Sequence, residues 1–233
     1  MAKQLRLKSQ EVGRVRITEQ DPIATVRIRS GVFHLDGEYD YAIPEKFHDL
    51  KPGVFVSVPF NGRNLEGMVI SRLSKPRVTG QLQNINKILP YHLNPHFIPF
   101  ISAVAQRWSA DFFDVLRFSV PVKSLVSSDS EIRKRKTQRT FYQMNPSQSE
   151  LKSLQSFISR VKGATLVVVP TENLLTKLSK IFPNAPILHS ATSNSERAKN
   201  YKNSIEGAEL VIGNRNSILH PRQFENVIIY EEC

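Results

Sequence analysis

Between residues 163 and 233 the sequence alternates short apolar runs with amphipathic stretches, and this alternation restricts the fold more than any other feature. Residues 163–170 (Gly-Ala-Thr-Leu-Val-Val-Val-Pro) predict a strand, and residues 171–182 predict an amphipathic helix. Further strands are predicted to end at Leu188-His-Ser190 and to cover 209–213 and 227–230. Strands that alternate with helices indicate a parallel sheet, so this part of the chain is predicted to be an α/β lobe.

Nucleotide-driven motors built on such sheets hold phosphates with a loop of the form G-x-x-x-x-G-K-[ST]. The ten glycines of this sequence lie at 13, 31, 37, 53, 62, 67, 80, 163, 207 and 213, and none is followed by lysine. We therefore expect no conventional ATP hydrolysis, no catalytic residue and no bound cofactor in this chain.

The N-terminal part shows a different sequence pattern, of short strands separated by turns. Residues 24–28, 39–43, 54–58, 65–70 and 85–89 read as short strands separated by turn signals such as Asp36-Gly37 and Asn61-Gly62. Five or six strands in about 70 residues are typical of a small barrel. A helix capped at Asn94-Pro95 is predicted from 95 to 114, with an aromatic stripe that packs in the core.

Basic charge is concentrated in the first 140 residues. The chain has a net charge of +11, of which residues 1–140 carry +9, from 22 Lys and Arg against 13 Asp and Glu. This predicts a polyanionic partner, the alternative being a solvated basic face. We expect a flexible basic arm at 1–20 and a linker at 124–144, followed by a helix from Asn145 to Val161. The linker residues predicted to contact the backbone of a nucleic acid are Arg133, Lys134, Arg135, Lys136 and Arg139.

Other classes of site are disfavoured by composition. Cys233 is the one cysteine, which leaves neither an internal disulfide nor a cysteine zinc cluster. His92 and His96 are separated by Pro95 and lack nearby acidic or thiol partners, so no metal site is expected. No apolar run is long enough for a bilayer and no signal peptide is evident, so the chain is expected to stay in the cytoplasm where it is made, without a membrane partner.

Four motifs of the N-terminal part resemble the PriA (primosomal protein N′) family of replication restart proteins. They are Tyr39-Asp-Tyr-Ala-Ile-Pro44, Pro52-Gly-Val-Phe-Val-Ser-Val-Pro-Phe60, Glu66-Gly-Met-Val69 and Trp108-Ser-Ala-Asp-Phe-Phe113. Their order and spacing are similar to those of the family. The resemblance implies that residues 21–123 form a β-barrel domain that binds the 3′ end of DNA.

The second half, 145–233, resembles the RecA-like helicase lobe of the same family. The matching stretches are Met144–Gln148, Val169-Pro-Thr-Glu172, Leu188-His-Ser190, Ser195-Glu-Arg197 and Val211-Ile-Gly-Asn-Arg-Asn-Ser217. Glu231 and Glu232 fall where a family helicase has its acidic D-E-E-H box, but Tyr230 replaces the first Asp and Cys233 the His. We therefore interpret the lobe as partial and degenerate, with Glu231 and Glu232 vestigial, as in a shortened copy of the divergent actinobacterial branch.

The resemblance also assigns roles to individual residues. Tyr39 would stack on the terminal base, Asp40 would lie beside the sugar hydroxyl, and the Asn61-Gly62 turn would close the pocket. Gln83 stands where the family has a basic pocket residue. Asn214, Arg215 and Asn216 either contact a DNA backbone or only cap the turn that follows their strand.

Three hypotheses about function follow. The first is a DNA-binding restart protein that recognises forks through the 3′ end of the leading strand and recruits primosome proteins and single-strand-binding protein without unwinding. The second is an ATP-dependent 3′→5′ helicase of the same family, whose members use ATP, Mg²⁺ and zinc. The third is a truncated remnant with no settled role.

Overall fold

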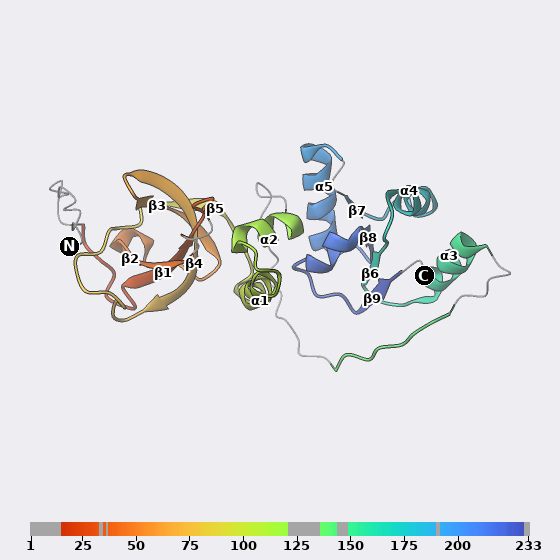
Figure 1. The fold of residues 1–233 in the computed structure, drawn as a ribbon, viewed down its shortest axis with the longest axis horizontal. Helices are drawn as coiled ribbons and strands as arrows, with labels where there is room; N and C mark the ends of the chain where they lie inside the picture. Colours follow the sequence, from red (N-terminus) through yellow and green to blue (C-terminus); the bar gives the residue numbers. More distant parts are fainter. Residues whose placement is uncertain are drawn as a thin grey trace. The chain divides into compact units, whose positions relative to one another are not determined.

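The structure, a computed structural model, describes residues 15–32, 35, 37–120, 136–143, 149–189 and 192–230. The chain divides into two compact units, one that extends to Pro90 and one that begins at Tyr91 (Figure 1). The predicted combination of an N-terminal antiparallel barrel and a later parallel α/β lobe is confirmed.

The first unit is built on a five-stranded sheet in the order β2-β1-β4-β3-β5. The strands are β1 (Ile23–Ile28), β2 (Glu38–Ala42), β3 (Val54–Phe60), β4 (Arg63–Leu73) and β5 (Lys87–His92), and a short 3-10 turn, η2, covers Glu45–Phe47. Strand β1 pairs antiparallel with both β2 and β4, and β3 pairs antiparallel with β4.

The sheet closes on itself just before β5. The amide of Ala42 donates to the carbonyl of Gln83 and the amide of Ile85 donates back to Ala42, while Asn86 donates to Ser57 of β3. These bonds join the two edges of the sheet, which is how a small barrel removes its free edges. The barrel expected from the short strands is therefore present.

The barrel interior is filled by side chains that alternate along the strands. Ala24, Val26 and Ile28 of β1 are fully buried, and Val56 and Val58 of β3 are buried opposite them. Burying one Val or Ile side chain contributes about 1.5–3 kcal/mol, so this alternation is the main source of stability for the unit.

The prediction of a flexible arm over 1–20 is wrong for residues 16–18. Ile17 bridges Pro44, Thr18 donates its amide to Ile43, and Glu45 donates its amide to Arg16. These backbone bonds fix residues 16–18 to the barrel, and residues 1–14 lie outside the described residues.

The helix predicted over 95–114 is wrong in its continuity. A 3-10 turn, η3 (Pro95–Phe97), leads into α1 (Ile98–Trp108), and a separate helix, α2, covers Phe112–Ser119. Ser109 adopts a left-handed conformation that ends α1, and the Asp111 carboxylate accepts hydrogen bonds from the amides of Phe113 and Asp114 to begin α2. The predicted cap at Asn94 is confirmed, because its side chain accepts from the amide of His96.

The remainder of the second unit is a parallel sheet with helices, as predicted. Its elements are α3 (Glu150–Arg160), β6 (Thr165–Val168), α4 (Glu172–Ile181), β7 (Ile187–Leu188), α5 (Asn194–Ile205), β8 (Leu210–Gly213), η4 (Arg215–Leu219) and β9 (Asn226–Ile229). The strand order is β7-β8-β6-β9, and every paired strand is parallel.

The start of α3 differs from the sequence prediction. The expected cap, Asn145, lies outside the described residues, and the helix begins at Glu150 after Ser149. Leu154 and Ile158 of α3 are buried against β6 and α4, which accounts for the amphipathic pattern that predicted the helix.

No helix among the described residues is both long enough and apolar enough to cross a bilayer. In the same part of the chain, no three His, Cys, Asp or Glu side chains gather where they could hold a metal ion.

Candidate functional site

A cavity of about 400 Å³ opens in the first unit, between strand β2, the β3–β4 turn and the loop that follows β4. We call it the first cavity. Its lining residues are Glu38, Tyr39, Asp40, Tyr41, Pro59, Phe60, Asn61, Arg77, Val78, Gln81, Leu82 and Gln83. These residues come from three separate stretches of sequence, which the barrel topology brings together.

Four of the five residues predicted for the 3′-end pocket line this cavity. Tyr39 and Asp40 come from β2, Asn61 from the β3–β4 turn, and Gln83 from the segment that closes the barrel. The fifth, Gly62, lies in the same turn as Asn61 but is not a lining residue. The roles assigned to these residues by resemblance stay predictions.

The β3–β4 turn owes its shape to its two central residues. Asn61 and Gly62 both have positive φ, 46° and 76°, while Phe60 pairs with Arg63 across the turn. A two-residue hairpin turn with positive φ at both positions favours the Asn-Gly sequence. The turn therefore holds Asn61 and the neighbouring Phe60 at the cavity.

Aromatic side chains form one wall of the first cavity. The rings of Tyr39 and Phe60 meet edge to face with their centroids 5.0 Å apart. Tyr41 is buried and donates its hydroxyl to the carbonyl of Pro59 at 3.0 Å, and burial raises the pKa of Tyr41 to about 12. Tyr41 therefore belongs to the barrel core, whereas Tyr39 is only partly buried and is the aromatic side chain of β2 that a ligand can reach.

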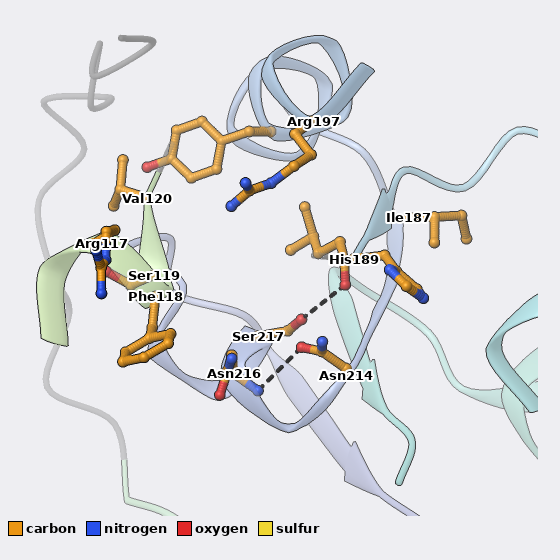
Figure 2. Close-up of a pocket in the computed structure, with 12 residues that line it drawn as sticks. Arg117, Phe118, Ser119, Val120, Ile187, His189, Arg197, Asn214, Asn216 and Ser217 are labelled. Carbon is orange, nitrogen blue, oxygen red and sulfur yellow. Dashed lines mark hydrogen bonds between the residues drawn. The ribbon is translucent and has the colours of Figure 1, made fainter. Parts of the chain in front are cut away.

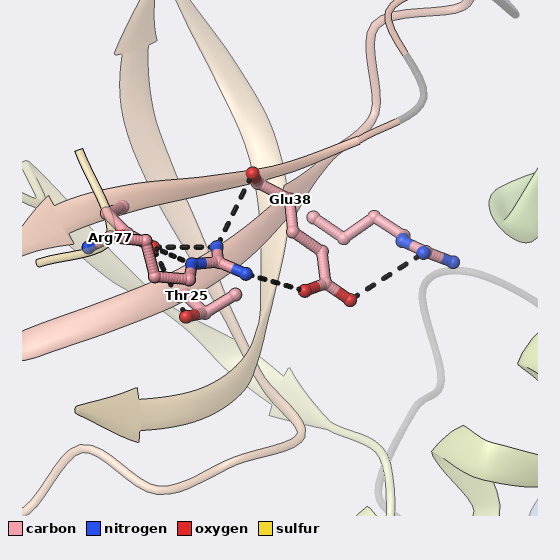
Figure 3. A network of polar contacts seen from close by, with 5 residues as sticks. Thr25, Glu38 and Arg77 are labelled. Carbon is pink, nitrogen blue, oxygen red and sulfur yellow. Dashed lines mark hydrogen bonds and ion pairs between the residues drawn. The ribbon is translucent and has the colours of Figure 1, made fainter.

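Arg77, which no sequence motif indicated, lies at the first cavity beside Glu38 (Figure 3) and binds Asp40. Its Nη2 and Nε donate to Asp40 Oδ1 at 2.7 Å and 3.0 Å, and its main-chain amide donates to Asp40 Oδ2 at 2.7 Å. Its Nη1 donates to Glu38 Oε2 at 3.2 Å, and Thr25 donates to Asp40 Oδ1 at 3.3 Å. A loop arginine carries no periodic signal, and only a pairing of β2 with this loop could have indicated it.

The charges around the first cavity are balanced. Burial alone would raise the pKa of Asp40, but the hydrogen bonds and charge of Arg77 outweigh it and hold that pKa below its ordinary value. Arg77 has a raised pKa for the same reason. Arg27 also approaches Glu38, at 3.7 Å, so that two arginines face two carboxylates and the cluster has no formal net charge.

A second cavity, of about 270 Å³, lies in the second unit at the carboxyl ends of β7 and β8 (Figure 2). Arg197 of α5 and Arg117 of α2 are among its lining residues, with Asn214 and Asn216. Asn214 accepts a hydrogen bond from the amide of Asn216, so the capping alternative for this stretch is confirmed for Asn214.

The other predicted contact residues are only partly described. Lys136 and Arg139 are exposed and lie in a segment, 136–143, without regular secondary structure. Arg133, Lys134 and Arg135, and the box residues Glu231 and Glu232, lie outside the described residues.

Comparison with known proteins assigns the first part of the chain. Residues 26–121 match the family profile of the 3′DNA-binding domain (3′BD) of PriA. The "Probable replication restart protein PriA" of Mycobacterium tuberculosis strain H37Rv is 36% identical over 93 residues, and the protein of the same name from Mycobacterium leprae is 33% identical over 93 residues. In both cases the match covers 39% of this chain and 14% of the relative.

The barrel, its cavity and the helices that follow it are thus those of a 3′DNA-binding domain, a class of domain whose partner is DNA. Residues 26–121 carry this similarity to the PriA replication restart proteins. The chain spans only a small part of the length of the mycobacterial relatives that it matches.

Proposed function

We propose that this chain is a DNA-binding replication restart protein that recognises stalled or branched forks by the 3′ end of the leading strand. The observation that carries the proposal is the coincidence of the matched region, 26–121, with a cavity lined by Tyr39, Asp40, Asn61 and Gln83. These are four of the residues at which the family resemblance puts the terminal nucleotide.

The size of the first cavity supports an unpaired end as ligand. Its volume of about 400 Å³ lies at the lower end of the range for pockets that bind single small molecules, about 300–1,000 Å³. One nucleotide suits such a cavity, whereas a base-paired helix is far too large for it. Because the terminus would be bound by shape and stacking, recognition need not depend on sequence.

The basic charge of the N-terminal part of the sequence supports binding of the rest of the fork. The net charge of +9 in residues 1–140 attracts the phosphate backbone without regard to sequence. The chain would then recruit primosome proteins and single-strand-binding protein in the bacterial cytoplasm, and it would do so without unwinding DNA, since the sequence has no phosphate-binding loop.

The test compares three synthetic forks that differ only at the leading strand: one with a 3′-OH end at the junction, one with a 3′-phosphate there, and one without the strand. We expect the wild-type chain to bind the 3′-OH fork most tightly and Tyr39→Ala to lose this preference. The matched control is Phe100→Ala, because Phe100 is an exposed aromatic residue of α1. Equal affinities of the wild-type chain for all three forks would exclude end recognition.

A further inference from the structure

Arg77 stands at the first cavity with both hydrogen-bonding edges of its guanidinium already in use. Nε and Nη2 form one edge and bind Asp40 Oδ1 at 3.0 Å and 2.7 Å. Nη2 and Nη1 form the next edge and bind the main-chain carbonyl of Glu38 at 3.5 Å and its carboxylate at 3.2 Å. A phosphate that approached in the plane of the group would find both edges occupied.

The same side chain is nevertheless 46% exposed, whereas the side chain of Asp40 is only 1% exposed. Since the nitrogens face Glu38 and Asp40, the parts of this side chain left for a ligand are the flat face of the guanidinium and the aliphatic stem. The carboxylates also neutralise the charge of Arg77, so this side chain attracts phosphate only weakly. Its planar guanidinium can still stack on a flat ligand group.

The carboxylates fix the orientation of that surface before a ligand arrives. Asp40 is held by Thr25 and by the main-chain amide of Arg77, and Glu38 is held by Arg27 at 3.7 Å. An arginine whose rotamer is already fixed loses little conformational freedom when it binds, which increases the affinity available from stacking.

We propose that the guanidinium face of Arg77 is a stacking platform for the unpaired nucleobase in the first cavity, with Tyr39 and Phe60 as the aromatic wall of the same cavity. The ligand class is a single-stranded nucleic acid end of any base, because every base has a stacking face. Asp40 and Glu38 are positioning residues for Arg77. This inference rests on the proposed function for the identity of the ligand.

The test uses the full chain and a single-stranded oligonucleotide whose 3′-terminal base is 2-aminopurine, a base whose fluorescence is quenched by stacking. We expect quenching with the wild-type chain. Arg77→Lys keeps the charge but has no flat face, so it should lose the quenching and at least about 5-fold in affinity, the lower end of the contribution of one stacked base. Arg29→Lys, a partly exposed arginine of the same unit outside the cavity, should behave as wild type.

Two further arms separate stacking from charge and from loss of structure. Arg77→Tyr restores a flat face without charge and should regain quenching, provided that its thermal unfolding matches that of Arg77→Lys. The wild-type chain should bind an oligonucleotide with an abasic 3′-terminal residue more weakly than the intact oligonucleotide. Arg77→Lys should bind the two oligonucleotides with equal affinity. Quenching by Arg77→Lys equal to that by the wild-type chain would overturn the platform, whatever Arg77→Tyr does.

The outcome also distinguishes this inference from the proposed function. If a circular oligonucleotide binds as tightly as a linear one, end recognition fails. Quenching of an internal 2-aminopurine that is lost in Arg77→Lys would then still support stacking on Arg77. Quenching that is equal in the wild-type chain and Arg77→Lys would exclude the platform whether or not ends are preferred.

Discussion

Asp40 and Arg77 lie 37 positions apart in the sequence and are joined by three hydrogen bonds of 2.7–3.0 Å. This pair ties strand β2 to the loop that supplies Val78, Gln81 and Leu82 to the first cavity. Together with the contacts of Arg77 to Glu38, this pair fixes one wall of the candidate site to the barrel.

Breaking this pair should lower stability in a pH-dependent way. The pKa of Asp40 is depressed in the folded protein, so its contribution is complete above the ordinary value of 3.8 and is lost as the pH falls through the lower folded value. We expect Asp40→Asn to cost about 1–3 kcal/mol at pH 7, and the difference from wild type to shrink below pH 3.8. Calorimetric unfolding of the full chain measures this, with the exposed Asp49→Asn as the control. A difference that is constant down to pH 2 would contradict it.

Gly67 in β4 has no room for a side chain. A Cβ at this position would lie 2.5 Å from Val26 Cγ1 and 2.9 Å from the carbonyl oxygen of Arg27, both on the neighbouring strand β1. Gly67→Ala should therefore destabilise the barrel by about 1–3 kcal/mol. At Gly37, where the nearest atom would be at an ordinary 3.6 Å, the same substitution should be far milder. Equal melting temperatures for the two variants would show that β1 moves without cost.

His220 should make the second unit sensitive to acid. Burial, with the charge of Arg222, lowers the pKa of His220 from 6.5 to about 3. Its Nδ1 accepts the amide of Arg222 at 3.1 Å, and its Nε2 lies 2.7 Å from Ser204 Oγ, an arrangement that suits the neutral ring. The unfolded chain takes up the proton more readily, so stability is complete above pH 6.5 and falls by about 1.4 kcal/mol per pH unit towards pH 3.

The check for His220 is urea unfolding followed by circular dichroism at 222 nm, since all five α-helices among the described residues belong to the second unit. His220→Gln should be less stable at pH 7 but should lose the slope between pH 6.5 and 4.5. His96→Gln, at an exposed position, should retain the slope. An unchanged slope in His220→Gln would place the acid sensitivity elsewhere.

The basic linker should contribute affinity without specificity. Replacing Arg133, Lys134, Arg135, Lys136 and Arg139 with Gln should weaken binding to all DNA forms and reduce the salt dependence of log K by up to about 3.5, or 0.7 for each lost phosphate contact on a single strand. The preference for a 3′-OH end should be unchanged. A matched control replaces the exposed lysines Lys152, Lys177, Lys180, Lys199 and Lys202. An equal loss in both variants would indicate general charge rather than a linker contact.

ATP turnover should be absent. The sequence has no glycine followed by lysine, so no side chain of the usual kind meets the phosphates. A coupled ATPase assay with forked DNA and Mg²⁺ tests this, and DNA-stimulated turnover that disappears in Glu231→Gln would support the helicase alternative instead.

The fold was largely predictable because its signals are periodic. Alternation in β1 and the Asn61-Gly62 turn predicted a barrel, and the apolar runs of β6 and β8 predicted a parallel sheet. The break between α1 and α2 was not predicted, because the aromatic stripe continues through Phe112 and hides the cap at Asp111. Asp111 accepts two amide hydrogen bonds, and this cap starts a new helix although the apolar periodicity runs on from 97 to 112.

The candidate site was only half predictable. Tyr39, Asp40, Asn61 and Gln83 could be named from motif order, and the structure brings them to one cavity. Arg77 could not be predicted, because its position at the cavity depends on the path of a loop that has no regular structure. Its presence also changes the expected role of Asp40, whose carboxylate already accepts four hydrogen bonds before any sugar hydroxyl arrives.

Strand β9 pairs with β6 on one side, and no strand among the described residues covers its other side. Its Val227 and Ile229 side chains are half exposed, at 50% and 52%. An edge strand that carries exposed apolar side chains is a place where two copies of a protein can pair. Concentrated preparations should therefore self-associate, and a lysine at position 227 should keep them dispersed.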